Sequence, residues 1–337
     1  ETMRMELTSF SALLFNPVAQ VKFVHTVAAG YVTGAVFVLA ISSWYLLKGR
    51  DLGFARRSFA IASAFGMASI LSVIILGDES GYEIGDVQKT KLAAIEAEWH
   101  TEPAPAAFTL FGLPNQAEQR TDYAIKIPYV MGIIATRSLD TQVTGIKDLI
   151  KQHEVRIRNG MQAYALLEKL RNGEKTPENL AAFDQHKQDL GYGLLLKKYT
   201  PAVVDASEAQ IKQAALDTIP NVATVFWSFR LMVASGFLML GLFICAFWAS
   251  ARKNEEKKRW LLKWALLSLP LPWVAAQTGW IVAEHGRQPW SIAEVLPVHL
   301  STSTVSAADV WGSLLALLAF YSVLLVIEMY LMIKFAR

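Results

Sequence analysis

The sequence predicts an all-α fold: a polytopic membrane helix bundle with one long extracytoplasmic loop. Of its 337 residues, 53% are hydrophobic and only 18% are charged, which is less charge than soluble domains usually carry. The apolar residues gather into five runs, each long enough to cross a bilayer, for which about 20 residues suffice. A long polar stretch, residues 78–218, separates the second run from the third.

The five predicted spans cover about residues 19–47, 56–77, 221–249, 260–284 and 308–333. They divide the chain into four parts: an extracytoplasmic N-terminal segment (1–18), the first two spans (19–77), the loop (78–218) and the last three spans (219–337). Pro270 and Pro272 are expected to kink the fourth span, because proline interrupts the hydrogen bonds of a helix.

The basic residues of the short loops predict the orientation of the chain. Short loops rich in Lys and Arg stay in the cytoplasm. The loop after the first span carries four basic residues and the loop after the third carries five, whereas the loop after the fourth has only Arg287 before Asp309. Basic and non-basic connections thus alternate along the chain, as they must if five spans cross the membrane in turn. The N-terminal segment, the 78–218 loop and the turn after residue 284 are therefore expected on the outer side, and the C-terminus in the cytoplasm.

The 78–218 loop carries helical signals of its own. Residues 146–171 have apolar positions among charges, as an imperfect amphipathic helix does. Thr176 followed by Pro177 indicates a helix start, and Ser207 with Gln210 matches a capping box. The prolines and the glycine between Pro103 and Pro128 are interpreted as turns. A loop this long usually has a function, and we expect a folded lobe or lid.

Several classes of function are disfavoured by composition. The net charge of +3 does not suggest a nucleic-acid partner. The single cysteine, Cys245, rules out a disulfide framework or a cysteine-based metal site within this chain. The first residues do not form a signal peptide, and the chain does not begin with Met, which suggests a fragment or a processed piece.

Ionisable residues inside membrane spans are costly and suggest function. With the predicted orientation, His25 lies about 9 Å below the outer edge of the first span, at 1.5 Å per residue. Arg230 and Met232 lie in the outer half of the third span, and Glu284 ends the fourth, just before Arg287. These residues thus gather toward the membrane face that carries the lobe.

Haem chemistry suits such a set, because iron takes His and Met as axial ligands and arginines pair with propionates. Small residues near His25, such as Gly30 and Gly34, would let a flat ring approach. The ordinary alternatives remain open at this point. Gly30 and Gly34 also form a helix-packing motif. Met232 could simply fill space in the apolar core, and Glu284 with Arg287 could form an ion pair at the membrane interface. Trp280 shares a helix face with Glu284 and is also typical of an interface anchor.

The segment after the second span, residues 77–99, combines hydrogen-bond donors and acceptors at the membrane surface. Lys91 supplies a donor, and Glu96 and Glu98 supply acceptors. Such a mixture suits a quinone head group and its protons. A solvated helix with scattered ion pairs is the competing interpretation.

Four stretches resemble subunit I of the cytochrome bd-type quinol oxidases: VKFVHTVAAGYVTGA (21–35), GDESGYEIGDVQKTKLAAIEAEW (77–99), FRLMVASGF (229–237) and GWIVAEHGRQPW (279–290). With the spans between them they cover nearly the whole chain. The long insert resembles the long form of that family's quinol-binding loop.

The resemblance implies a role for each site residue. His25 and Met232 match the axial ligands of the low-spin haem b558, with Arg230 beside it. Glu284 matches a ligand of the high-spin haem b595, and Trp280 matches an aromatic between haems. Lys91 and Glu96 match residues of quinol binding and oxidation. Arg287 and Gln288 belong to the GRQPW motif and are assigned to the haem surroundings.

The resemblance also implies a function and partners. We expect a haem subunit of a terminal oxidase in the bacterial inner membrane, which oxidises ubiquinol or menaquinol, reduces O2 to water and builds a proton gradient without pumping. A second subunit and small accessory membrane subunits are expected partners. The family's first four spans, which carry a ligand of the haem d site, have no counterpart here. A cytochrome b anchor of another dehydrogenase and a cofactor-free transporter subunit are the alternatives.

Overall fold

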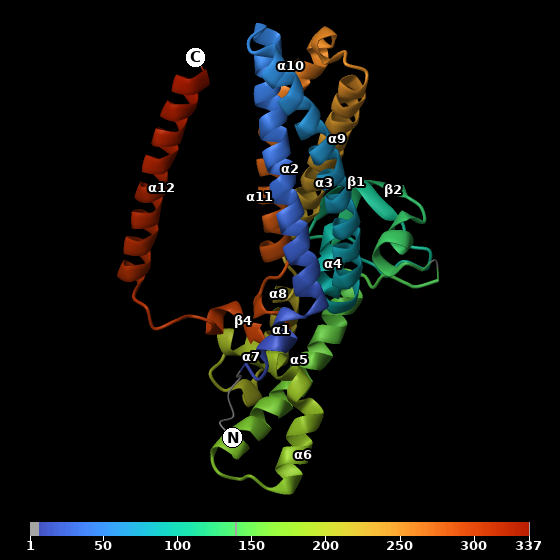
Figure 1. The fold of residues 1–337 in the computed structure, drawn as a ribbon. Helices are drawn as coiled ribbons and strands as arrows, with labels where there is room; N and C mark the ends of the chain where they lie inside the picture. The colour runs from blue at the N-terminus through green and yellow to red at the C-terminus, as the bar shows by residue number, and fades with distance from the viewer. Residues whose placement is uncertain (1–6, 139, 337) are drawn as a thin grey trace. The chain divides into compact units, whose positions relative to one another are not determined.

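The computed structural model describes residues 7–138 and 140–336 and confirms the predicted helical membrane fold (Figure 1). Five helical segments are long and apolar enough to span a bilayer. The chain forms two compact units, of which the first ends at Pro297 and the second covers Val298–Arg337. The second unit comprises η6 (Val298–Leu300) and the apolar helix α12 (Ala307–Ala336), whose described side chains are almost all exposed.

The membrane part of the first unit is built from α2 (Pro17–Lys48), α3 (Leu52–Val87), α9 (Val222–Ala251), α10 (Arg259–Leu267) and α11 (Leu271–His285). Helix α3 packs against α2 and α9, and α11 packs against α9 and α2. Apolar side chains that are fully buried fill the centre of this group, among them Leu39, Phe59, Ile70, Leu242 and Phe243. The short helix α1 (Phe10–Leu14) precedes α2, and its N-cap residue is Ser9, whose hydroxyl accepts from the Ala12 N–H.

The second predicted span is too short at its C-terminal end. Helix α3 continues without a break through the GDESGYE stretch to Val87, ten residues beyond the predicted end at residue 77. Arg137 explains this extension, because it pairs with Glu79 and Asp78 and its guanidinium lies 4.3 Å from the centroid of the Tyr82 ring. The charged turns of α3 are thus held by protein contacts outside the apolar run.

The fourth span is broken where its prolines predict. α10 ends at Leu267 and α11 begins at Leu271, with Pro270 as its N-cap residue. At the other end of the bundle, Arg56 of α3 donates to Glu256 over 2.6 Å. Glu256 belongs to η5 (Glu255–Lys257), between α9 and α10. The two basic loops therefore share one end of the bundle, as the orientation argument requires.

Residues 88–138 and 140–221 fold into a lobe of helices and a hairpin. Its elements are, in chain order, α4 (Lys89–Glu96), β1 (Phe108–Asn115), β2 (Arg120–Ile127), η1 (Gly132–Thr136), α5 (Ile146–Arg171), α6 (Pro177–His186), η2 (Lys187–Asp189), α7 (Leu190–Leu194), η3 (Leu195–Lys198), η4 (Val203–Asp205) and α8 (Glu208–Asp217). The predicted 146–171 helix is confirmed, as are the caps at Thr176 and Ser207.

The hairpin of β1 and β2 was not predicted. Its antiparallel register pairs Thr109 with Lys126 and Leu113 with Asp122, with irregularities on either side of Phe111. Gly112 and Pro114 lie inside β1 and not in the turns we inferred from them. A strand at the edge of a sheet, or one with a bulge, accepts proline and glycine, so these residues do not by themselves mark a turn. A second small sheet joins β3 (Trp290–Ile292) to β4 (Leu296–Pro297).

Two glycines bring α5 and α7 into backbone contact, and a larger residue there should destabilise the lobe. A Cβ atom at Gly160 would lie 2.3 Å from both the Asp189 carbonyl oxygen and the Gly193 nitrogen. We expect Gly160→Ala to reduce the free energy of unfolding by roughly 1–3 kcal/mol, the usual cost of overpacking. Thermal unfolding and proteolysis of the purified complex measure this. Gly53→Ala in helix α3, whose Cβ would meet nothing within 4 Å, is the control and should not lower the free energy of unfolding.

Candidate functional site

Helix α4 carries two fully buried charged side chains that reach different neighbours. Lys91 and Glu96 are each 2% exposed. Their helix packs against α9, α3 and α5 at the base of the lobe. The five-residue separation turns the two side chains apart, so that Lys91 points to α11 and Glu96 points to α9 and the hairpin.

The Lys91 side is a cluster of charged groups at the end of α11. The Lys91 ammonium donates to the Ala283 carbonyl oxygen at 3.0 Å. Next to it, Arg287 forms an ion pair with Glu284, and the Gln288 amide donates to the Glu284 carbonyl oxygen at 3.3 Å. Lys22 of α2 is close enough to interact electrostatically with Glu284 and Arg287. We call Lys22, Lys91, Glu284, Arg287 and Gln288 the α11 cluster.

A polar cavity of about 450 Å³ opens beside the α11 cluster. The turn after α11, the start of α4 and one face of α5 line it. Two lining residues, Gln88 and Arg287, each have a buried polar atom without a hydrogen-bond partner in the described structure, namely Oε1 and Nε. A cavity of this size with converging polar groups is typical of a ligand site.

The Glu96 side is a compact hydrogen-bonded centre. Glu96 Oε2 accepts from the Thr109 backbone N–H at 2.9 Å and lies 3.5 Å from Arg230 Nη2. Arg230 also donates to the carbonyl oxygens of Thr109 and, at 2.6 Å, of Ile95. Its guanidinium carbon lies 3.3 Å from the centroid of the Phe226 ring. We call Glu96, Thr109 and Arg230 the Glu96 centre.

Burial shifts both α4 side chains toward neutrality. Burial, together with the nearby Lys22 and Arg287 charges, lowers the pKa of Lys91 to about 8, while Glu284 partly offsets this change. Burial raises the pKa of Glu96 to about 7, against the opposing effects of Arg230 and the Thr109 N–H. Both groups can therefore exchange a proton near neutral pH, which is the range that acid–base chemistry requires.

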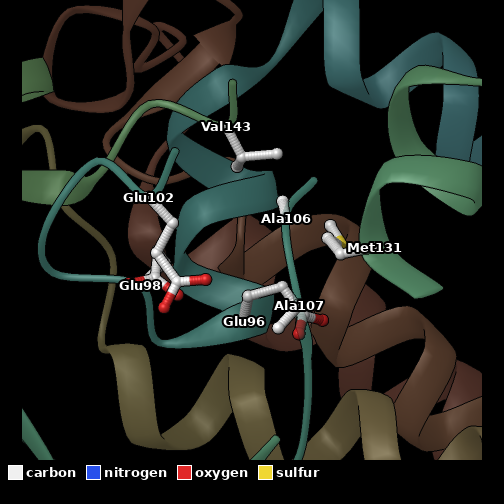
Figure 2. Close-up of a pocket in the computed structure, with 7 residues that line it drawn as sticks. All are labelled: Glu96, Glu98, Glu102, Ala106, Ala107, Met131 and Val143. Atoms are coloured by element: carbon white, nitrogen blue, oxygen red, sulfur yellow. The ribbon is translucent and has the colours of Figure 1, made fainter. Parts of the chain in front are cut away.

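A narrow cleft next to the Glu96 centre holds two further carboxylates. Glu96, Glu98 and Glu102 line it together with Ala106, Ala107, Met131 and Val143 (Figure 2). Lys126 donates to Glu98 at 2.9 Å and also pairs with Glu102. In the close-up the carboxylates of Glu98 and Glu102 lie side by side, and Glu96 lies across the cleft beside Ala107.

The predicted haem ligands lie on helices that contact the same neighbours. His25 of α2 packs on α3, where a Cβ at Gly77 would lie 3.4 Å from its ring. Met232 of α9 packs on α11, where a Cβ at Gly279 would lie 3.0 Å from its sulfur. Trp280 is 65% exposed in this chain.

Sequence reasoning missed a second polar network, which ties the lobe to the turn after α11. Arg156 of α5 donates to Asp189 at 2.6 Å and to Glu294, between β3 and β4, at 2.7 Å. Beside it, His153 hydrogen-bonds Thr218 at 2.7 Å, and burial lowers the pKa of His153 to about 4. These partners are 33 to 138 residues apart in sequence, and no local pattern links them.

Comparison with known proteins identifies the family. The family model for cytochrome bd terminal oxidase subunit I matches residues 1–337. The chain belongs to this family. It is 48% identical over 337 residues to the cytochrome bd-II ubiquinol oxidase subunit 1 of Escherichia coli, and 27% identical over 332 residues to the cytochrome bd ubiquinol oxidase subunit 1 of Bacillus subtilis.

This bd oxidase chain spans 66% and 59% of the lengths of those two relatives, while they match 100% and 98% of it. The bd oxidase of Geobacillus thermodenitrificans shares the fold, with a TM-score of 0.65 and 23% identity, over 96% of this chain and 59% of that one. The family resemblance read from the four sequence stretches is thereby confirmed, as is the helical membrane fold.

Proposed function

We propose that this chain is the haem-binding and quinol-oxidising part of a bacterial terminal oxidase, which oxidises quinol, reduces O2 to water and builds a proton gradient without pumping. Family membership supports an oxidase, and two relatives are named ubiquinol oxidase subunits. The complex resides in the inner membrane, with residues 78–218 on the periplasmic side and the C-terminus in the cytoplasm. A second subunit and accessory membrane subunits complete it.

The observation that carries the proposal is the placement of α4. This one helix sends Lys91 to the end of α11, next to Glu284, and sends Glu96 to Arg230, two residues from Met232. Lys91 and Glu96, the proposed quinol-binding residues, therefore lie next to both of the proposed haem sites. Electron transfer from a bound quinol requires this proximity, and a merely solvated α4 would not bury two charges.

The residues present fit haem. His25 Nδ1 is buried and has no hydrogen-bond partner in the described structure, as expected of an imidazole that awaits a ligand partner. Space is open around Gly30 and Gly34 of α2 and Gly236 of α9. We assign His25 and Met232 to the low-spin haem b558, with Arg230 beside it, and Glu284 to the high-spin haem b595. Trp280 is assigned to the space between haems, and Arg287 and Gln288 to the haem surroundings.

Bound haem would supply the one-electron chemistry that connects a two-electron quinol to oxygen. His–Met ligation leaves no open position, so the low-spin site suits electron transfer. The family's haem d site requires residues outside this chain. This chain's own acid–base groups, Lys91 and Glu96, would bind ubiquinol or menaquinol and take up the protons that its oxidation releases.

The test is a reduced-minus-oxidised spectrum of the complex purified with its natural partners, followed by oxygen uptake with quinol. We expect haem b signals and quinol-dependent oxygen consumption. A colourless complex would eliminate the proposal in favour of a transporter subunit, and haem without oxygen uptake would favour a cytochrome anchor.

Glu284→Ala should remove one high-spin haem signal from the intact complex, because the variant loses the proposed carboxylate ligand. Glu284→Asp should keep part of the signal. Haem extraction and absorption spectra measure the change. The exposed carboxylate Glu118, replaced by Ala, is the control and should keep all signals. An unchanged spectrum in Glu284→Ala would refute the assignment, and would leave the Glu284–Arg287 ion pair as its only role.

A further inference from the structure

The turn after α11, residues 286–297, begins two residues beyond Glu284 and is barely supported by its own sheet. Strands β3 and β4 pair at Trp290 with Pro297 and at Ile292 with Leu296, with an irregularity between the two pairs. A two-stranded hairpin is marginally stable in water even when it is longer than this. Contacts from outside the turn must therefore help to fix its position.

Hydrogen bonds make the turn continuous with the end of α11. The Trp290 N–H donates to the Arg287 carbonyl oxygen at 3.0 Å, and the Gln288 N–H donates to the His285 carbonyl oxygen at 3.2 Å. The Gln288 side chain donates to the Glu284 carbonyl oxygen at 3.3 Å, and Arg287 pairs with the Glu284 carboxylate. A displacement of Trp290 would thus be passed along these contacts to Glu284.

Side chains of the lobe hold the turn at two places. Trp290 is 7% exposed and packs in one apolar cluster with Ile157 of α5 and Tyr192 of α7. Its ring centroid lies 5.1 Å from that of Tyr192. Glu294 is held by both carboxylate oxygens: Oε2 accepts from Arg156 at 2.7 Å, and Oε1 accepts from the Tyr192 hydroxyl at 3.1 Å. The lobe thus binds the turn through both an apolar and a polar contact.

The backbone at Glu294 is also fitted closely to α7. A Cβ atom at Gly191 would lie 2.1 Å from the Glu294 carbonyl oxygen, so only glycine allows this approach. Glu294 has a φ of 61°, in the left-handed region that a glutamate rarely adopts. Such a conformation persists where the surrounding contacts enforce it. The turn is therefore held in a specific shape by the lobe.

Arg156 is itself fixed before it reaches Glu294. Its Nε donates to Asp189 at 2.6 Å, and the Asn159 amide donates to the same carboxylate at 3.3 Å. The guanidinium carbon lies 4.1 Å from the centroid of the Tyr192 ring. An isolated ion pair at a surface contributes little to stability. Here the planar guanidinium is oriented by a second carboxylate and a ring, which makes its contact with Glu294 directional.

We propose that Arg156 is a positioning residue for the high-spin haem site. Through Glu294 it holds the turn after α11 against α5 and α7, and so keeps Glu284 in place as a ligand. The inference rests on the proposed function, in which Glu284 ligates that haem. The lobe then acts as a fixed support of the haem site. Groups that orient a metal ligand from outside typically contribute roughly 10–100-fold to metal affinity.

Transfer of haem from the intact complex to excess apomyoglobin tests this role. We expect Arg156→Met and Glu294→Ala to speed the loss of the high-spin haem b signal roughly tenfold, the lower end of that range, and to leave the low-spin signal at the parent rate. Because the two residues act through one contact, the double variant should match the single ones. Arg158→Met is the matched control, since Arg158 lies on the same helix and pairs with Glu208 within the lobe. It should lose haem at the parent rate.

Tyr192→Phe tests the same contact if a larger change blocks assembly. It keeps the buried ring and removes only the hydroxyl that joins Arg156 to Glu294, so it should speed the loss of the high-spin signal by a smaller factor. Parent rates in all these variants would overturn the positioning role. Equal acceleration for both haems would overturn it too, because it would show a general loss of stability. A parent complex without haem would instead refute the proposed function.

Discussion

Replacement of His25 by alanine should abolish the low-spin haem signal and quinol-dependent oxygen uptake of the intact complex. The ring nitrogen Nδ1 of His25 is buried and has no hydrogen-bond partner among the described residues, and Gly77, which lies against the ring, has no side chain that could replace the imidazole as a ligand. Because electrons from quinol would enter there, the loss of activity should be complete within the assay, while the high-spin signals persist.

Met232→Leu should give a different result from His25→Ala. In this variant His25 alone would hold the haem, so the signal should convert from low spin to high spin and should respond to carbon monoxide. Met239→Leu is the matched control, because Met239 lies two helical turns further along α9 and is buried in the apolar core. Absorption spectra of both variants measure the difference. A low-spin spectrum that survives Met232→Leu would contradict the axial assignment.

The features that the sequence predicts correctly depend on residues that are close together in the chain, and those it misses depend on distant contacts. The spans depend on runs of apolar residues in one segment of chain, and the structure confirms all five. Caps at Thr176 and Ser207 depend on residues three apart, and they are confirmed too. The predicted end of the second span was wrong, because the end of α3 depends on Arg137, which is 58 residues from its partner Glu79. The hairpin was missed because Gly112 and Pro114 were interpreted as turns.

The candidate site was predictable as a set of residues and not as an arrangement. Family motifs pointed to Lys91 and Glu96 together, because they are close in sequence. Only the structure separates them into the α11 cluster and the Glu96 centre. Thr109 lies in a stretch without any motif, and the sequence does not reveal that its backbone contacts both Glu96 and Arg230. The same holds for the pairing of Arg156 with Glu294.

Glu96→Gln should lower the rate of quinol oxidation by roughly 100-fold or more, the usual contribution of a positioned base. Glutamine keeps the shape and can still accept from the Thr109 N–H, but it cannot take up a proton. Haem signals should remain. Glu118→Gln makes the same chemical change at an exposed carboxylate of the hairpin and should have no effect on the rate. Equal rates in Glu96→Gln and the parent protein would exclude Glu96 as the base.

The pH dependence of the parent protein provides a second measurement of the same group. Because burial raises the pKa of Glu96 to about 7, the carboxyl is protonated and inactive as a base at lower pH. The rate at low quinol concentration should therefore rise about tenfold per pH unit up to about pH 7 and then level off. Glu96→Asp should keep a rise of this form, and Glu96→Gln should lose it.

The raised pKa also means that ionised Glu96 destabilises the folded protein at working pH. Its pKa is higher in the folded protein than the ordinary 4.5, so the folded state holds a proton that the unfolded state releases. The contribution of Glu96 to stability is thus greatest at acid pH and falls as pH rises from about 4.5 to about 7, by roughly 3 kcal/mol for a shift of this size. At pH 8, Glu96→Gln should unfold at a temperature no lower than the parent protein. Loss of activity with undiminished stability would then identify Glu96 as a group kept for its chemistry, whereas lower stability at pH 8 would show that the Arg230 contact outweighs the cost of burial.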